Sequence, residues 1–249
     1  MSTIRKAIDD ARRTIAPRHG DPHGPLPGLL VALTVVTGLV DAFSYLELGR
    51  VFVANMTGNV VFLSFSLGGA PGFLWWASAL AIAAFFVGAF LGGRLAATHR
   101  CHRGRHLRLA ATAQTMLVLA ATIAAILFAV PYGDPAIVVL VILLGVGMGL
   151  QNATARSLAV PDLTTTVLTL TITGISADNR AAGGPGSRVG RRTVSILALF
   201  VGGLIGALLW NAGIGWCSML AATVLLAIVV IVANRTSRST EEWAHKPGR

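Results

Sequence analysis

The chain has 249 residues, of which 54% are hydrophobic and 12% are charged, and its mean hydropathy is +0.72. Soluble domains carry about a quarter charged residues, so this composition excludes an ordinary soluble protein. The net charge of +10 would suit a nucleic-acid binder, but the arginines stand in short blocks between apolar runs, a pattern that orients membrane helices. The sequence therefore predicts an all-α, polytopic membrane helix bundle without a nucleic-acid partner.

Six apolar runs are long enough to cross a bilayer, which takes about 20 residues each. We expect these transmembrane helices at 28–48, 73–93, 109–130, 136–155, 193–210 and 212–233. Two shorter apolar stretches, 55–70 and 160–177, each follow a polar break and could be re-entrant or fully spanning. The predicted domains are thus a basic tail at 1–27, a membrane domain at 28–233 and a basic tail at 234–249.

The positions of lysine and arginine favour one topology. If neither short stretch crosses and the N-terminus is cytoplasmic, 19 of the 20 Lys and Arg residues lie on the cytoplasmic side and only Arg50 lies outside. If the first stretch crossed, the basic cluster at 94–108 would face the side opposite the N-terminal cluster, against the positive-inside rule. We therefore expect six crossings, two short re-entrant or broken helices, and both termini in the cytoplasm.

Two motifs recur in the second half of the chain. Residues 55–63 (NMTGNVVFL) align with 162–170 (DLTTTVLTL), and residues 86–92 (FVGAFLG) align with 200–206 (FVGGLIG). Each half, at about 28–130 and 136–233, then reads as helix, short stretch, helix, helix. Because three crossings per half is an odd number, the halves would have opposite orientations, which predicts an inverted 3+3 repeat of the kind found in secondary transporters.

Two blocks of the sequence resemble a known family. Residues 40–46 (VDAFSYL) with 49–63 (GRVFVANMTGNVVFL), and residues 147–153 (GMGLQNA) with 160–168 (VPDLTTTVL), closely resemble the YoaK-like family of bacterial multi-pass membrane proteins. The likeness covers roughly 28–233 and leaves the tails outside. It implies a bacterial inner-membrane location and a membrane domain of six to seven helices, and it implies no activity.

Asp41 is the sharpest candidate for a functional residue. It lies thirteen positions into the first apolar run, about 20 Å along a helix axis. A carboxylate at that depth is costly, usually faces the bundle interior and could serve as a proton relay. The alternative is a neutral acid that hydrogen-bonds a neighbouring helix and serves packing alone. Glu47, three residues before Arg50, is expected to form a surface pair with it.

Polar side chains at the start of each short stretch form a second group of candidates. They could cap a short helix whose N-terminus offers free N–H groups to an anion or a carbonyl, or they could cap it and bind nothing. Gln151 and Asn152, in the fourth long run, could face the same cavity or clamp two helices together. The candidate substrate or ion pathway residues are Asp41, Asn55, Thr57, Asn59, Gln151, Asn152, Asp162, Thr164 and Thr165.

The remaining motifs indicate packing rather than chemistry. Two GxxxG pairs are predicted to let helices approach closely: Gly88 with Gly92, and Gly202 with Gly206. Three histidines and Cys101 stand among arginines around the loop 94–108, where zinc binding is the alternative to a plain basic loop. We expect no metal and no cofactor. No histidine is expected within a span and no HExxH or GxSxG motif occurs, so the sequence predicts no enzyme.

These features favour a small-solute or ion permease with a polar site near the midplane. The alternative is a non-transporting sensor or scaffold subunit whose basic cytoplasmic loops hold anionic lipid or a partner protein. The expected partners are the lipid bilayer, anionic lipid and an unidentified solute or ion, and assembly into a homo-oligomer is left open.

Overall fold

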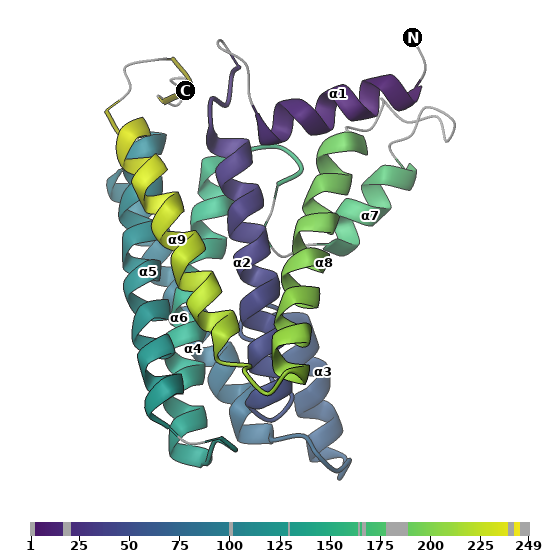
Figure 1. Ribbon diagram of the computed structural model, residues 1–249, viewed down its shortest axis with the longest axis vertical. Helices are drawn as coiled ribbons and strands as arrows, with labels where there is room; N and C mark the ends of the chain where they lie inside the picture. Colours follow the sequence, from purple (N-terminus) through teal and green to yellow (C-terminus); the bar gives the residue numbers. More distant parts are fainter. Residues whose placement is uncertain are drawn as a thin grey trace.

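The computed structural model describes residues 3–16, 21–99, 102–128, 130–163, 165, 168–177, 189–238 and 242–244. Within these residues the chain forms nine α-helices and one 3-10 helix, without a strand (Figure 1). Their bounds are α1 Thr3–Ile15, α2 Leu26–Glu47, α3 Met56–Leu67, α4 Trp75–Thr98, α5 Arg103–Leu127, α6 Asp134–Leu158, α7 Leu168–Ala177, α8 Val189–Asn211, α9 Cys217–Thr236 and η2 Glu242–Ala244. Six of them, α2, α4, α5, α6, α8 and α9, are long and apolar enough to cross a membrane. The predicted all-α membrane bundle is confirmed.

The two short helices do not carry the chain across the bundle. α2 ends and α4 begins at one end, so the chain between them, which includes α3, leaves and returns on the same side (Figure 1). In the same way α6 ends and α8 begins at the opposite end, with α7 between them. Both short stretches are therefore re-entrant, and the six long helices place the two ends of the described chain at the same end of the bundle.

Close backbone contacts join helices from the two halves of the chain. α8 packs along α2, and α4 packs along α6. A methyl group added at Gly202 of α8 would overlap the carbonyl oxygen of Val35 in α2, and one added at Gly88 of α4 would overlap the carbonyl oxygen of Val146 in α6. Glycine at these positions lets the helix backbones touch, which increases van der Waals contact where lipid offers no hydrophobic drive for association.

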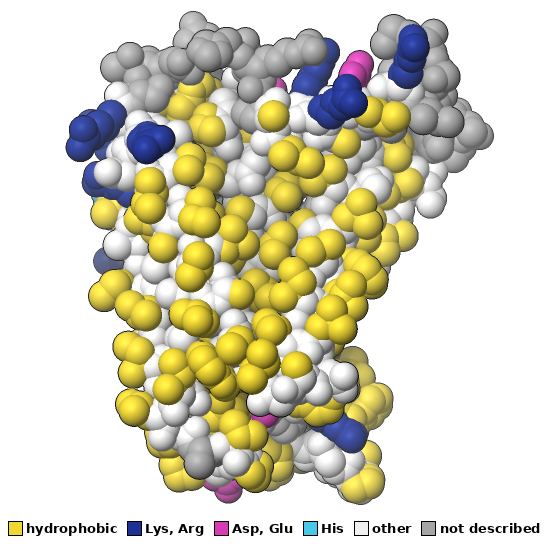
Figure 2. All heavy atoms as spheres, viewed as in Figure 1, with side chains coloured by type: hydrophobic (Ala, Val, Ile, Leu, Met, Phe, Trp, Pro, Cys, Tyr) yellow, Lys and Arg dark blue, Asp and Glu magenta, His cyan; other side chains and the backbone are white. Residues whose placement is uncertain are grey.

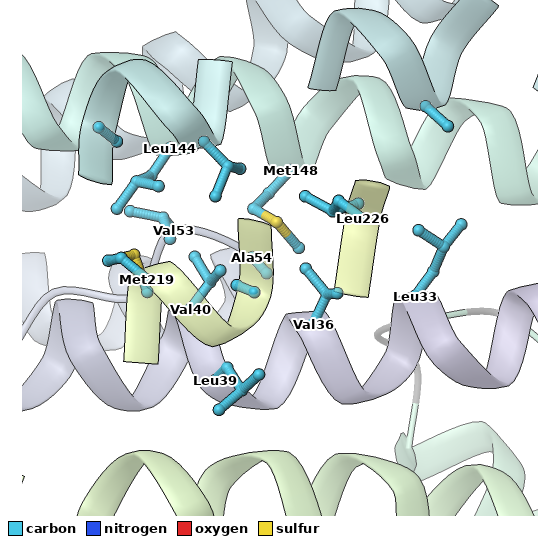
Figure 3. Packing of buried hydrophobic residues seen from close by; sticks show 14 of the residues in the cluster. Leu33, Val36, Leu39, Val40, Val53, Ala54, Leu144, Met148, Met219 and Leu226 are labelled. Atoms are coloured by element: carbon cyan, nitrogen blue, oxygen red, sulfur yellow. The ribbon is translucent and has the colours of Figure 1, made fainter. Parts of the chain in front are cut away.

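The apolar core lies around α2 and includes the connection between α2 and α3. Figure 3 shows Val53 and Ala54 among side chains from α2, α6 and α9. Val51 and Val53 are fully buried and Ala54 is 3% exposed. Non-helical backbone is tolerated at membrane depth only where protein or a polar cavity shields it, so this segment needs hydrogen-bond partners inside the protein.

Basic side chains gather at the end of the bundle where α1 lies, while the sides are largely apolar (Figure 2). α1 lies across that end and packs against α8 and α2 (Figure 1). The Asp10 carboxylate in α1 accepts the backbone N–H of Arg191 in the first turn of α8 at 2.9 Å. A carboxylate is favourable at a helix N-terminus because it satisfies a free N–H and the positive end of the helix dipole.

Candidate functional site

Asp41 fastens the non-helical segment before α3 to α2. Its Oδ1 accepts the backbone N–H groups of Val53 at 3.1 Å and Ala54 at 2.9 Å. These two donors lie in the connection between α2 and α3, on residues that are 0% and 3% exposed. Asp41 is the sixteenth residue of α2, about 9 Å along the axis from its end at Glu47. The carboxylate thus has a structural task in addition to any functional one.

Asn59 holds the same segment from its other side. Its side-chain oxygen accepts the backbone N–H of Phe52 at 2.9 Å, and its amide nitrogen donates back to the Phe52 carbonyl oxygen. Asn59 is fully buried in the first turns of α3. The Phe52 ring stacks on Tyr45 of α2, with ring centroids 4.9 Å apart. Asp41 and Asn59 therefore fix the entry to α3 between two helices.

A cavity of about 550 Å³ opens at this entry, and we call it the polar cavity because five polar side chains stand among the apolar ones in its wall. Asp41 and Thr37 line it from α2, and residues 54–58 line it around the start of α3. Thr169, in the first turn of α7, lies in the same wall. The beginnings of the two re-entrant helices thus face one cavity, although they belong to opposite ends of the bundle.

A second, mainly apolar cavity of about 520 Å³ adjoins the first between α2 and α8. The two cavities share three lining residues: Asp41, Asn55 and Leu199. The Asp41 Oδ2 atom makes no hydrogen bond within the described part of the chain, and it is not a buried atom lacking a partner. This oxygen is therefore open to the cavities.

Three predicted pathway residues line the polar cavity: Asp41, Asn55 and Thr57. Asn55 precedes α3 but makes no capping hydrogen bond with its side chain, so the predicted cap is wrong at this residue. The physical reason is that the first turn of α3 faces the cavity, where Asn55 is exposed. Asn59 does not line the cavity and instead holds the backbone behind it.

Gln151 forms a clamp between three helices. Its amide nitrogen donates to Thr37 Oγ1 at 2.8 Å and to the Leu33 carbonyl oxygen at 3.2 Å, both in α2. Its side-chain oxygen accepts from Gln114 of α5 at 2.6 Å. Gln151 is 1% exposed and lies behind the cavity wall, next to Thr37, rather than in it. Asn152 is half-buried, and its amide donates to the Met148 carbonyl oxygen.

Two predicted residues of the second short stretch, Asp162 and Thr165, lie apart from the cavity wall. Asp162, whose backbone is left-handed at φ 64°, forms an ion pair with Arg192 of α8 at 2.8 Å. The Arg192 guanidinium also fills the space beside Gly174, where a methyl group would overlap it. The ion pair therefore fastens the segment that follows α6 to α8, and the same guanidinium packs against α7. Thr165 is 1% exposed, and Thr164 lies outside the described residues.

Two expectations about charged and ionisable residues are wrong. Glu47 and Arg50 form no ion pair, since α2 ends at Glu47 and Arg50 has left-handed backbone at φ 59°. The Arg50 guanidinium lies over the Phe73 ring, 5.5 Å from its centroid. The span that was expected to begin near residue 109 begins at Arg103, so His106 lies within it, buried, with a ring nitrogen 2.9 Å from Ser157 Oγ.

A comparison with known protein families assigns the chain to one of them. The model of a family described as a protein of unknown function (DUF1275) matches residues 29–232. The chain belongs to this family. The UPF0700 transmembrane protein YoaK of Bacillus subtilis (strain 168) is 30% identical over 152 residues, which cover 60% of this chain and 65% of that protein. The match therefore spans less than two thirds of this relative. The resemblance to YoaK-like proteins seen in the motifs is confirmed, and no solved structure matches the chain.

Sequence reasoning missed several cavity residues of this DUF1275 protein. Thr37 could have been found, because it lies one helical turn before Asp41 and therefore on the same face of α2. Thr169 lay inside the motif aligned with α3, but nothing in the alignment showed which residue of the second stretch would reach the cavity. Leu199 and Phe85 are ordinary apolar residues of long spans, and the sequence carries no signal that distinguishes them.

Proposed function

We propose that this protein is a small-solute or ion permease whose polar site is the cavity at the start of α3. The observation that carries the proposal is that one cavity is lined by Asp41, by the first turn of α3 and by Thr169 of α7. Transporters place their substrate sites where discontinuous helices from two halves of the fold meet. A carboxylate with one free oxygen in such a cavity is the expected partner of a proton, a cation or a hydrogen-bond donor. No catalytic step is part of the proposal.

An inverted 3+3 repeat is part of this proposal, and the pairing of the helices supports it. The contact of α8 with α2 has its counterpart in the contact of α4 with α6, and the contact of α2 with α9 has one in that of α6 with α5. The closest contacts of α2 with α8 have the same spacing along the chain as those of α6 with α4. Val35 corresponds to Val146, Gly38 to Gly149, and Ala42 to Ala153. Counted from these pairs, Asp41 of the first half corresponds to Asn152 of the second. The proposed repeat thus places a carboxylate in α2 and an amide in α6 at equivalent positions, and only the carboxylate lines the cavities.

We place the protein in the bacterial inner membrane with both termini in the cytoplasm. The support is the basic end of the bundle, which carries α1 and both ends of the described chain (Figure 2). Lysine and arginine accumulate on the cytoplasmic side of membrane proteins. Single cysteines introduced at Arg13 and at Gly69, followed by labelling from outside, test the placement, because only the second should react with an impermeant reagent.

Flux into proteoliposomes tests the permease function. Solutes are first screened by their effect on the thermal stability of the purified protein, and those that stabilise it are then offered for uptake. The protein should show saturable uptake that Asp41→Asn reduces or makes independent of pH. Asp134→Asn is the matched control, since Asp134 is the first residue of α6 and lines neither cavity. Unchanged rate and pH dependence in Asp41→Asn would refute a coupling role, and flux that never saturates would indicate a channel.

A sensor or scaffold is the second candidate, and α1 is the observation that favours it. α1 is amphipathic, and Arg12 and Arg13 in its last turn are exposed. A basic amphipathic helix at the membrane surface binds anionic lipid and can present a docking surface to a partner. Tight co-purification of one partner, lost in an Arg12→Glu, Arg13→Glu double variant, would support this role. The absence of any solute-dependent thermal shift would support it further.

A further inference from the structure

The two cavities differ in chemistry and meet at one carboxylate. The first contains hydroxyl and amide groups from Thr37, Asn55 and Thr57 beside Asp41. The second is lined almost entirely by apolar groups, including Ala42 in α2. Its other apolar lining residues on α2, α8 and the connecting segment include Leu46, Phe52, Ile196, Phe200 and Gly203. A molecule that occupied both cavities would therefore need a polar end and an apolar end.

The apolar cavity opens on the side of the bundle rather than at an end. Its wall includes Phe200 of α8, which is 62% exposed. α8 is one of the six helices long and apolar enough to cross a membrane, and the face of the bundle seen in Figure 2 is largely apolar. The exposed Phe200 ring therefore lies on the surface of the bundle that lipid tails cover. A molecule already dissolved in the bilayer could enter this cavity sideways without passing through water.

Charge at the junction decides which polar end fits. Asp41 is the acidic residue in the two walls, and no Lys or Arg among the described residues lines either cavity. Its Oδ1 is occupied by two backbone N–H groups, whereas Oδ2 is open. An open carboxylate oxygen without a basic neighbour is complemented best by a positively charged donor such as a primary ammonium group.

We infer that the site takes an amphipathic primary amine, with its ammonium group on Asp41 and its apolar chain in the cavity between α2 and α8. The molecule enters laterally from the bilayer between these helices. The inference rests on the proposed permease function and names its substrate class.

Equilibrium binding of two tritiated probes to the full chain in phosphatidylcholine nanodiscs tests the inference. Dodecylamine has the head and the chain, whereas methylamine has the head alone, and empty nanodiscs give the background from partitioning. Gly203→Leu places a side chain in the apolar cavity, and it is compatible with the fold because a Cβ at Gly203 meets nothing within 4 Å. Gly93→Leu is the matched control, since Gly93 of α4 is exposed, equally free of neighbours and outside both cavities. Ile196→Trp is a second variant that fills the same cavity.

The expected pattern separates the chain from the head. Gly203→Leu and Ile196→Trp should each weaken dodecylamine binding by about tenfold or more, the effect expected when an apolar pocket loses room for its ligand. The two variants should leave methylamine binding unchanged. Asp41→Asn should weaken both probes, and Gly93→Leu neither. Unlabelled 1-dodecanol, matched in bilayer mole fraction, should compete far less well than dodecylamine because it lacks the charge.

Comparing variants at one chain length is necessary because every added methylene also concentrates the amine in the bilayer. Unchanged dodecylamine affinity in both cavity-filling variants would overturn the inference. Loss of methylamine binding in both cavity-filling variants would also overturn it, since the two cavities would then act as a single site for the head group. If 1-dodecanol competed as well as dodecylamine, the claim that the site requires a charged head group would be refuted. Because the assay measures binding without flux, a protein that binds as described but transports nothing would refute the permease function alone.

Discussion

Replacing Asp41 by alanine or by asparagine separates its structural role from its charge. Asp41→Ala removes the acceptor of the Val53 and Ala54 N–H groups, which are 3.1 and 2.9 Å from Oδ1 in the buried connection. A hydrogen bond to a charged group contributes about 1.5–3 kcal/mol, and a buried donor left unpaired costs a similar amount. Because both donors share one oxygen, we expect a total loss of about 3–5 kcal/mol in the free energy of unfolding.

Asp41→Asn should lower the free energy of unfolding much less than Asp41→Ala. Its amide oxygen can take the place of Oδ1 and accept both N–H groups, so that only the charge assistance is lost, about 1–2 kcal/mol. In a protein of this size a change of 1 kcal/mol moves the Tm by about 2–4 °C. We therefore expect Asp41→Ala to lower the Tm by about 10 °C and Asp41→Asn by about 4 °C.

Thermal unfolding of the purified protein in nanodiscs measures both shifts. Thr57→Ala is the control, because Thr57 lines the same cavity and its side chain makes no hydrogen bond within the described residues. It should leave the Tm unchanged. Equal shifts for alanine and asparagine, or a shift for Asp41→Ala no larger than that for Thr57→Ala, would refute the idea that Asp41 holds the entry to α3.

Three further predictions are checked by the same unfolding measurement. Gly202→Ala forces a methyl group into the backbone of α2 and should destabilise by about 1–3 kcal/mol, whereas Gly203→Ala, one residue on, meets nothing within 4 Å and should not destabilise. Gln151→Leu removes a hydrogen-bond partner from Thr37 in α2 and from Gln114 in α5, both buried, and should lower stability by about 2–4 kcal/mol; a neutral result would mean that the clamp is not formed. Burial and the negative charge of Glu47 raise the pKa of Tyr132, in the turn between α5 and α6, to about 12 from 10.0. The neutral phenol therefore stabilises the fold below pH 10, this stabilisation is lost as the pH rises toward 12, and Tyr132→Phe should lower the dependence of Tm on pH in that window.

The long spans and the re-entrant stretches could be predicted because their signals are local. An apolar run of about 20 residues has few structures open to it in a bilayer, and a basic block marks the side on which it ends. Asp41 could be recognised for the same reason, since a carboxylate within an apolar run is costly wherever the run packs. The start of α5 was misplaced by six residues because Arg103 and His106 are polar but buried against the end of α6 and the C-terminal segment.

The site itself could be predicted only in part because its partners come from distant elements. Nothing in the sequence shows that residues 51–54 fold into the core, so Asn59 read as a cap when it holds the Phe52 backbone. The expected pair of Glu47 and Arg50 assumed that α2 continues, whereas the helix ends at Glu47 and the next residues turn. The apolar cavity depends on how α8 lies along α2; the pair of Gly202 and Gly206 predicts a close helix contact but does not identify α2 as the partner.

The Gln151 clamp also has an electrical consequence. It lies directly behind Thr37, which lines the cavity, and both ends of its amide are engaged by α2 and α5. Side chains so occupied offer water no free donor or acceptor, so the clamp opposes the passage of water between α2, α5 and α6. The clamp thus helps to keep ions from leaking through the bundle, a leak that the membrane voltage would drive with about 2.3 kcal/mol per elementary charge per 100 mV.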